Sequence, residues 1–256
     1  MTIPAVFFGH GSPMNALETN EYTEMWSNFG ARIPTPRAIL AISAHWYVAE
    51  TAVTAMAHPP TIHDFGGFPQ ELFDVEYQAP GSPELAAQVA DLLSPLPVRQ
   101  DTNSWGLDHG TWSVLTHVFR EAQIPVVQIS LDGTKPFAHH LAVGAALAPL
   151  MEDGVLLMGS GNVVHNLRAI SFGADGQGTP WAERFDRATT ELLKCNPSDI
   201  ASLQSHPDYQ MAVPTEDHFL PLVVFAGIAA AVGRPVEVVG GGCTMGSLSM
   251  TSYSVN

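Results

Sequence analysis

Short apolar runs alternate along the chain with longer segments in which apolar residues recur at helical spacing. A short apolar run that stops at glycine or at a polar cluster is typical of a buried β-strand. The first such run, Ala-Val-Phe-Phe, stops at Gly9. The pattern predicts strands over residues 5–8, 38–42, 53–55, 126–131, 155–158, 236–239 and 248–255.

Helix start signals mark the segments between these runs. Ser82 and Pro83 predict a helix over 82–93, because serine caps a helix N-terminus and proline suits the first turn. Thr179 and Pro180 predict another helix, through residue 193, in the same way. Further helices are predicted over residues 110–119, 137–151 and 214–232, the last with acidic residues at its positive end.

The order of these elements predicts the fold class. Strands that alternate with helices form a mostly parallel sheet with helices packed on both faces. We therefore expect an α/β fold, in which a single three-layer domain spans residues 1–256 and helices flank a central, mostly parallel (mixed) sheet. Two stretches rich in proline and glycine, residues 59–81 and 197–214, break the pattern. We predict them to be long loops, which are often functional.

Composition limits the classes of partner. The 256 residues are 46% hydrophobic and 14% charged, which indicates one large globular domain and disfavours disorder. The net charge of −15 disfavours binding to nucleic acid or to anionic membrane surfaces. No run has the length of a transmembrane helix, and the N-terminus lacks a signal-peptide pattern, so we expect a cytoplasmic protein. We expect it to be a monomer or a small homo-oligomer.

Two cysteines and the absence of several motifs narrow the chemistry further. Cys195 and Cys243 form no CxxC pair, which disfavours thiolate zinc sites, and we expect both to be reduced. The chain contains no Gly-x-Ser-x-Gly elbow, no P-loop, no dinucleotide-binding glycine fingerprint and no His-Glu-x-x-His motif.

Histidines in loop-like contexts are the strongest candidates for chemistry. His10 and His45 each follow a predicted strand, and the carboxyl ends of parallel strands meet at one edge of a sheet. Neutral imidazole is the commonest metal ligand, so we expect both to bind a metal. Glu216, Asp217 and His218 offer a third ligand; a carboxylate would favour Fe(II), and a histidine would suit Fe(II) or Zn(II).

Three further histidines extend the candidate site. His165 lies in a Gly/Ser/Asn loop after a buried strand, as a fourth ligand or a general base. His109 directly precedes a predicted helix, and its sequence context favours a catalytic role and a purely structural role at the helix start almost equally. His63 lies in the first long loop, which we interpret as a substrate wall or lid. Trp46, Phe65, Phe68 and Trp112 are candidate pocket walls, although packing in the core is the more usual role for each of them.

Six motifs occur in an order that resembles a known family. Together they resemble the LigB-type, class III extradiol ring-cleavage dioxygenases, in the extradiol DOPA dioxygenase-like branch, and residues 245–250 fit that branch too. The motifs are Gly-His-Gly-Ser-Pro-Met at 9–14, Ser-Ala-His-Trp at 43–46, Thr-Ile-His-Asp-Phe-Gly-Gly-Phe-Pro at 61–69, Trp-Gly-Leu-Asp-His-Gly-Thr-Trp at 105–112, Gly-Ser-Gly-Asn-Val-Val-His-Asn-Leu at 159–167 and Glu-Asp-His-Phe-Leu-Pro-Leu at 216–222.

The resemblance implies an enzyme that opens the ring of a catechol, such as DOPA, with O2. It implies a divalent metal on His10, His45 and His218, with Fe(2+) for activity and Zn(2+) in the purified protein. In the wider family the third ligand is a carboxylate; here the matching position is His218, which leaves the metal's identity more open. His165 would be a further ligand or the catalytic base, and His109 an acid/base and substrate contact, with His63 in the substrate pocket.

Three rival functions use some of the same residues. A zinc hydrolase would use these histidines to activate a metal-bound water and would work without oxygen. A tetrapyrrole metal chelatase would share the His-Gly-Ser after the first strand, but this match covers only His10 among the six motifs. A non-catalytic metal-binding protein would keep the metal without turning over a catechol.

Overall fold

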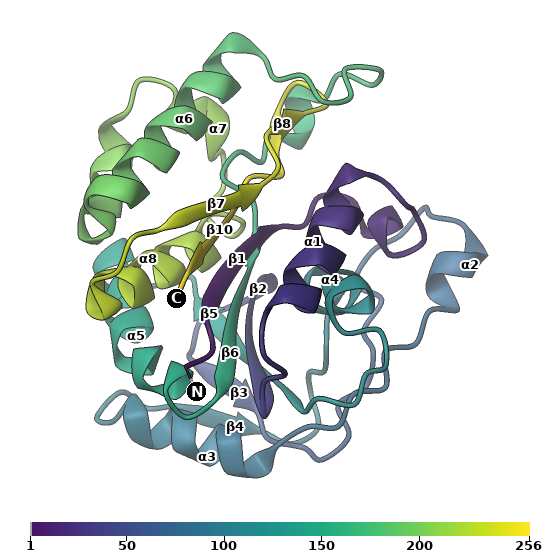
Figure 1. Cartoon of the computed structure of the whole chain (residues 1–256), viewed down its shortest axis with the longest axis vertical. Helices are drawn as coiled ribbons and strands as arrows, with labels where there is room; N and C mark the ends of the chain where they lie inside the picture. Colours follow the sequence, from purple (N-terminus) through teal and green to yellow (C-terminus); the bar gives the residue numbers. More distant parts are fainter. Residues whose placement is uncertain (1) are drawn as a thin grey trace.

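A large mixed sheet forms the centre of the molecule, as a computed structural model describing residues 2–256 shows (Figure 1). Its strand order is β4-β3-β5-β2-β6-β1-β10-β7. The four central strands β5, β2, β6 and β1 are parallel, and β3 and β10 run antiparallel to their inner neighbours. The predicted fold class, an α/β domain with a mostly parallel sheet, is confirmed.

The elements have the following bounds. The strands are β1 (Ala5–Gly9), β2 (Ala38–Val48), β3 (Ala52–Thr54), β4 (Arg99–Asp101), β5 (Val126–Asp132), β6 (Val155–Gly161), β7 (Glu237–Gly240), β8 (Cys243–Thr244), β9 (Leu248–Ser249) and β10 (Ser252–Val255). The α-helices are α1 (Glu21–Arg32), α2 (Gln70–Phe73), α3 (Pro83–Leu92), α4 (His109–Val118), α5 (Phe137–Leu147), α6 (Pro180–Cys195), α7 (Tyr209–Ala212) and α8 (Leu220–Val232). Short 3-10 helices are η1 (Pro13–Ala16), η2 (Ala148–Met151), η3 (Leu167–Ala169) and η4 (Pro197–Ser205).

Alternating side chains of the central strands build a core on each face of the sheet. In β1, Phe7 joins one hydrophobic cluster and Phe8 joins the other, because successive side chains of a strand point to opposite faces. Helices α5, α6 and α8 cover the first face, and α1 and α4 cover the second (Figure 1). The strands are buried on both faces, so they read as continuous apolar runs in the sequence.

Two predictions near the C-terminal half were wrong in detail. The helix predicted from residue 214 begins at Leu220, because residues 214–219 form turns in which Phe219 N–H donates to the Glu216 carbonyl at 2.9 Å. The strand predicted over 248–255 is split at Met250 and Thr251. There the chain leaves the β8–β9 hairpin for the central sheet, and Ser249 Oγ accepts a bond from Thr251 N–H at 3.2 Å.

Several elements were not predicted. Helix α1 has a capping box, in which the Asn20 side chain accepts from Thr23 N–H and the Thr23 side chain bonds Asn20 in return. The predicted loop 197–214 contains η4 and α7, and the predicted loop 59–81 contains α2. Edge strand β4 also escaped prediction, because its three residues are polar or charged. Within residues 2–256, no helix combines the length and apolar character that crossing a membrane would require.

The topology gathers the candidate histidines at one edge of the sheet. His10 follows β1 directly, and His165 follows β6. His45 lies inside β2, where the pairing with β5 shifts register between Ile42 and Tyr47. Such a bulge re-aims a side chain. The predicted meeting of histidines at the carboxyl ends of parallel strands therefore matches the observed arrangement.

Candidate metal centre

His10 is buried just after the carboxyl end of β1, and Ser160 on the neighbouring strand β6 sets the orientation of its ring. The imidazole Nδ1 lies 3.0 Å from Ser160 Oγ, and that hydroxyl donates to the Gly110 carbonyl. Because the Ser160 hydrogen is used on Gly110, Ser160 Oγ accepts from His10 Nδ1–H. A neutral imidazole has one donor and one acceptor nitrogen, so His10 Nε2 keeps its lone pair.

His45 presents its Nε2 to the same point. Its Nδ1 lies 3.1 Å from Asp64 Oδ2, and its Nε2 lies 3.2 Å from His10 Nε2. The carboxylate accepts from Nδ1–H, so in the neutral imidazole His45 Nε2 is an acceptor too. Two acceptor nitrogens cannot hydrogen-bond to each other. Their separation matches two ligands about 2 Å from one ion, so the two histidines fit a divalent metal.

His109 lies beside this pair at the first position of α4. Its Nδ1 and its backbone N–H both donate to Asp64 Oδ1, at 2.9 and 3.0 Å. Nitrogen atoms of His10, His45 and His109 all lie within 4.8 Å of one another. Asp108, the sequence neighbour considered for orienting His109, instead caps α4 and accepts from Ser43 Oγ at 2.7 Å.

His218 completes the cluster from the turn before α8. Its ring centroid lies 5.4 Å from that of His10 and 5.1 Å from that of His45. Asp217 Oδ2 accepts from His218 Nδ1–H at 2.7 Å, so Asp217 orients the ring. Glu216 points elsewhere, since its carboxylate accepts from the Tyr209 hydroxyl at 3.3 Å. Among Glu216, Asp217 and His218, the three alternatives for a third ligand, His218 is the residue whose side chain lies next to the His10–His45 pair.

His165 stacks on His218 at the outer side of the cluster. The two rings are 3.5 Å apart at their centroids and 6° from parallel. The backbone of His165 is fixed by a bond from its N–H to the Ala212 carbonyl at 2.9 Å and by a bridge to Leu248. Burial, together with the nearby His218, lowers the pKa of His165 to about 3, so the imidazole is neutral near pH 7.

The electrostatics of the cluster favour neutral imidazoles at two of the proposed ligands. Burial, and then the neighbouring histidines, lower the pKa of His10 well below its ordinary value. Burial also lowers the pKa of His218, although Asp217 opposes the shift. At His45 burial acts in the same direction, but the bond to Asp64 and nearby carboxylates outweigh it and raise the pKa. Neutral nitrogen is the form that binds a metal.

Aromatic side chains of the long loop lie next to the cluster. Phe65 packs edge-on to His109 with ring centroids 5.4 Å apart, and Phe68 packs against Phe65 at the same separation. His63 Nε2–H donates to the Val75 carbonyl at 2.9 Å, and the centroid of its ring lies 5.5 Å from that of Trp112. Phe65 and Phe68 are only partly buried, which fits a pocket wall.

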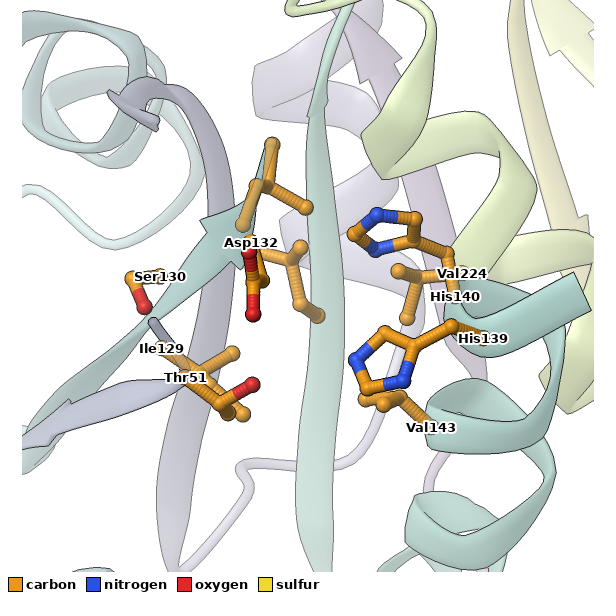
Figure 2. Close-up of a pocket in the computed structure, with 10 residues that line it drawn as sticks. Thr51, Ile129, Ser130, Asp132, His139, His140, Val143 and Val224 are labelled. Atoms are coloured by element: carbon orange, nitrogen blue, oxygen red, sulfur yellow. The ribbon is translucent and has the colours of Figure 1, made fainter. Parts of the chain in front are cut away.

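The two tryptophans among the candidate walls are core residues. Trp46 is buried and stacks on Trp105 with centroids 5.6 Å apart, and Trp112 is fully buried. His139 and His140 line a separate small pocket with Asp132 and Ser130 (Figure 2). In the described part of the chain, His10, His45 and His109 form the one triad of possible ligands with all donor atoms this close together.

Sequence reasoning missed the role of Asp64. Its carboxylate holds both His45 and His109, although it is 45 residues from His109 in sequence. The only signal was its position beside His63 in a Gly- and aromatic-rich loop. Asp217 and Ser160, which orient His218 and His10, were likewise not identified as orienting residues.

Comparisons with known proteins identify the family of the chain. Residues 4–255 match the family described as the catalytic LigB subunit of aromatic ring-opening dioxygenase. The chain is 46% identical to the 4,5-DOPA dioxygenase extradiol of Escherichia coli K12 over 99% of this chain and 94% of that protein. It is 36% identical to the protein of the same name from Beta vulgaris, over 96% of this chain and 94% of that protein.

A solved structure shows the same fold. The crystal structure of an uncharacterized protein from Escherichia coli K12 superposes with a TM-score of 0.84 and 39% identity, covering 99% of this chain and 100% of that one. The predicted resemblance is thus confirmed, as is the expected enzyme class of extradiol dioxygenase. The chain belongs to the family of the catalytic LigB subunit of aromatic ring-opening dioxygenases.

Proposed function

We propose that this enzyme opens the ring of a DOPA-like catechol with O2 at a divalent metal held by His10, His45 and His218. The observation that carries the proposal is the 3.2 Å approach of two Nε2 acceptors whose Nδ1 atoms are already engaged. The names of the relatives, which specify 4,5-DOPA, support a catechol with an amino-acid side chain as the substrate.

Fe(II) is the proposed metal for activity, and Zn(II) is the metal we expect in purified protein. A bound Fe(II) supplies redox chemistry and open coordination positions for two reactants at one centre. Three histidine ligands also suit Zn(II), which has no redox chemistry. His109 lies close enough to compete with His218 as the third ligand, and both rings have their Nδ1 engaged by a carboxylate; we assign His218 from its matching motif.

His165 and His109 perform the proposed proton transfers. His165 is neutral near pH 7 and takes a proton from a catechol hydroxyl at its ring nitrogen. The second proposed role of His165, as a further ligand in a resting zinc form, uses the same nitrogen. Asp64 keeps the proton of His109 on Nδ1, so His109 Nε2 faces the site as an acceptor and later as a donor.

The aromatic loop supplies the substrate wall in this proposal. Phe65 lies over His109 and, with Phe68, offers apolar faces for a catechol ring. His63 lies behind Phe65, with ring centroids 5.8 Å apart, and lines the same pocket.

We further propose that the enzyme works in the cytoplasm on small molecules, as a monomer or small homo-oligomer. Its net charge of −15 disfavours nucleic acid and anionic membranes as partners.

Anaerobic loading with Fe(II), followed by DOPA or another catechol and then air, tests the proposal. We expect a yellow ring-opened product and oxygen uptake. A zinc hydrolase would instead act without oxygen when loaded with Zn(II), and a binding protein without catalysis would take up metal only. Absence of both colour and oxygen uptake with every catechol tested would contradict the proposal.

A further inference from the structure

One carboxylate, Asp64, touches two histidines that come from different elements. Asp64 Oδ2 accepts from His45 in β2 at 3.1 Å, and Asp64 Oδ1 accepts from the ring and backbone of His109 in α4. The Asp64 side chain is 17% exposed. Both oxygens of Asp64 therefore have partners in the histidine cluster, although Asp64 itself belongs to the loop between β3 and α2.

The loop around Asp64 is fixed on one side and open on the other. Before it, Ile62 N–H donates to the Leu107 carbonyl at 2.7 Å, and Trp112 Nε1–H donates to the Ile62 carbonyl at 2.9 Å. After it come Gly66 and Gly67, around which a side chain would meet no atom within 4 Å. Gly67 has φ +80°, a conformation that glycine tolerates best.

The residue between Asp64 and this glycine pair is Phe65, which packs on His109. The position of Phe65 therefore depends on Asp64, which is the last polar anchor before two glycines with open space around them. We define residues 64–68 as the aromatic loop. Its anchor is at the same time the group that orients the proposed ligand His45.

We propose that Asp64 is a positioning residue that couples metal binding at His45 to docking of the aromatic loop over His109. The inference rests on the proposed metal site and adds a link between that site and the substrate wall. Coupling of two events through one group is reciprocal: whatever stabilises the docked loop also raises metal affinity, and metal raises the stability of the docked loop.

A carboxylate is required because two N–H donors point at it from different sides. Each oxygen of Asp64 accepts from one imidazole Nδ1–H. An amide at this position keeps one acceptor oxygen and turns an NH2 group toward the other imidazole. One histidine then rotates or changes tautomer, and either change displaces the Nε2 that faces the site.

Asp64→Asn tests the coupling with two readouts that need no turnover. The first is Zn(II) affinity, measured by competition with a chromophoric chelator. The second is hydrogen exchange of residues 61–69, with and without saturating Zn(II). We expect zinc to slow this exchange in the wild type. In Asp64→Asn we expect affinity to fall ~10–100-fold, and zinc at saturation no longer to slow the exchange of these residues.

Two control variants separate coupling from general damage. Asp217→Asn removes the partner of His218 but leaves Asp64 in place. It should weaken zinc binding, while zinc at saturation still protects residues 61–69. Glu76→Gln changes an exposed carboxylate later in the same long loop and should behave as the wild type in both readouts. If Asp64→Asn does not fold, Asp64→Ala, which removes both acceptor oxygens, serves for the same measurements with the same expected results.

Two results would overturn the inference. One is wild-type zinc affinity in a folded Asp64 variant; the other is zinc protection of residues 61–69 in that variant equal to that of the wild type. The same experiment separates this inference from the proposed function. Coupling without any catechol turnover would contradict the catechol assignment alone, whereas no zinc binding by the wild type would contradict both the metal site and the coupling.

Discussion

The Nε2 atoms of His10 and His45 lie 3.2 Å apart, and each ring has its Nδ1 turned to a different acceptor. His10 uses a serine hydroxyl on β6, and His45 uses the carboxylate of Asp64. Since both nitrogens at the short contact are acceptors, the arrangement is stable when a cation lies between them. This relationship leads to predictions for the side chains that orient the two imidazole rings, as well as for the two histidines themselves.

Ser160→Ala should weaken metal binding without removing a ligand. The hydroxyl of Ser160 lies 3.0 Å from His10 Nδ1 and fixes the tautomer that leaves Nε2 free. We expect Zn(II) affinity to fall ~10–100-fold, while His10→Ala, which removes the ligand, loses more. Chelator competition measures both variants. Equal affinity in Ser160→Ala and the wild type would show that Ser160 does not orient His10.

His165→Ala should abolish catechol turnover and keep metal bound. The ring of His165 stacks on His218 and lies outside the His10–His45 contact, as expected for a base at the edge of the centre. Losing a general base costs ~100–10,000-fold in rate. Steady-state kinetics and metal analysis of the same sample make the test. Complete loss of metal from this variant would instead identify His165 as a ligand.

Phe65→Ala should raise KM for the catechol more than it lowers kcat. Phe65 packs edge-on to His109 and forms part of the proposed wall, but it carries no group that moves a proton. Loss of an aromatic contact of about 1 kcal/mol corresponds to a KM increase of roughly five-fold. Initial rates over a range of catechol concentrations measure it. A larger effect on kcat than on KM would place Phe65 in positioning His109.

His140 should make the metal-free protein less stable in mild acid. The side chain is 2% exposed, and Nε2 has no hydrogen-bond partner among the described residues. Burial, with a smaller effect from His139, lowers its pKa to about 4. The unfolded imidazole, with a pKa of about 6.5, binds its proton first as pH falls. The free energy of unfolding therefore decreases from about pH 6.5 to about pH 4 and is not lowered further by this group below that.

Replacing this histidine tests the sign of that dependence. Between about pH 7 and pH 4.5, the free energy of unfolding should fall less in His140→Gln than in the wild type, by ~2–3 kcal/mol. Urea denaturation of metal-free protein at both pH values provides the comparison. His58→Gln, an exposed histidine, is the matched control. Equal decreases in His140→Gln and the wild type would contradict a buried neutral His140.

Much of the fold could be predicted because the central strands are buried on both faces and therefore form plain apolar runs. His10 was placed correctly at the sheet edge because it directly follows such a run, and His165 because it lies in the loop that follows another. The capping box of α1 was visible in Asn20 and Thr23 but was overlooked. The start of α8 was misplaced because residues 214–217 carry helix-start signals that the chain uses for turns.

The orienting contacts of the site could not be predicted from spacing. Asp64 reaches His45 and His109 only after the loop of residues 59–81 has folded back along Leu107 and α4. The inward aim of His45 depends on a local register shift in β2, which no apolar pattern reveals. Such contacts arise from tertiary packing of irregular segments, whereas apolar periodicity reports only regular elements.

Oxygen consumption per ring opened is the most direct test of the account. An oxygen electrode and product absorbance, read together on Fe(II)-loaded wild-type protein with DOPA, give this ratio. We predict equal amounts of O2 consumed and product formed, and neither with His10→Ala. Product formed without oxygen consumption, or equal turnover by the wild type and His10→Ala, would contradict a dioxygenase acting at this histidine centre.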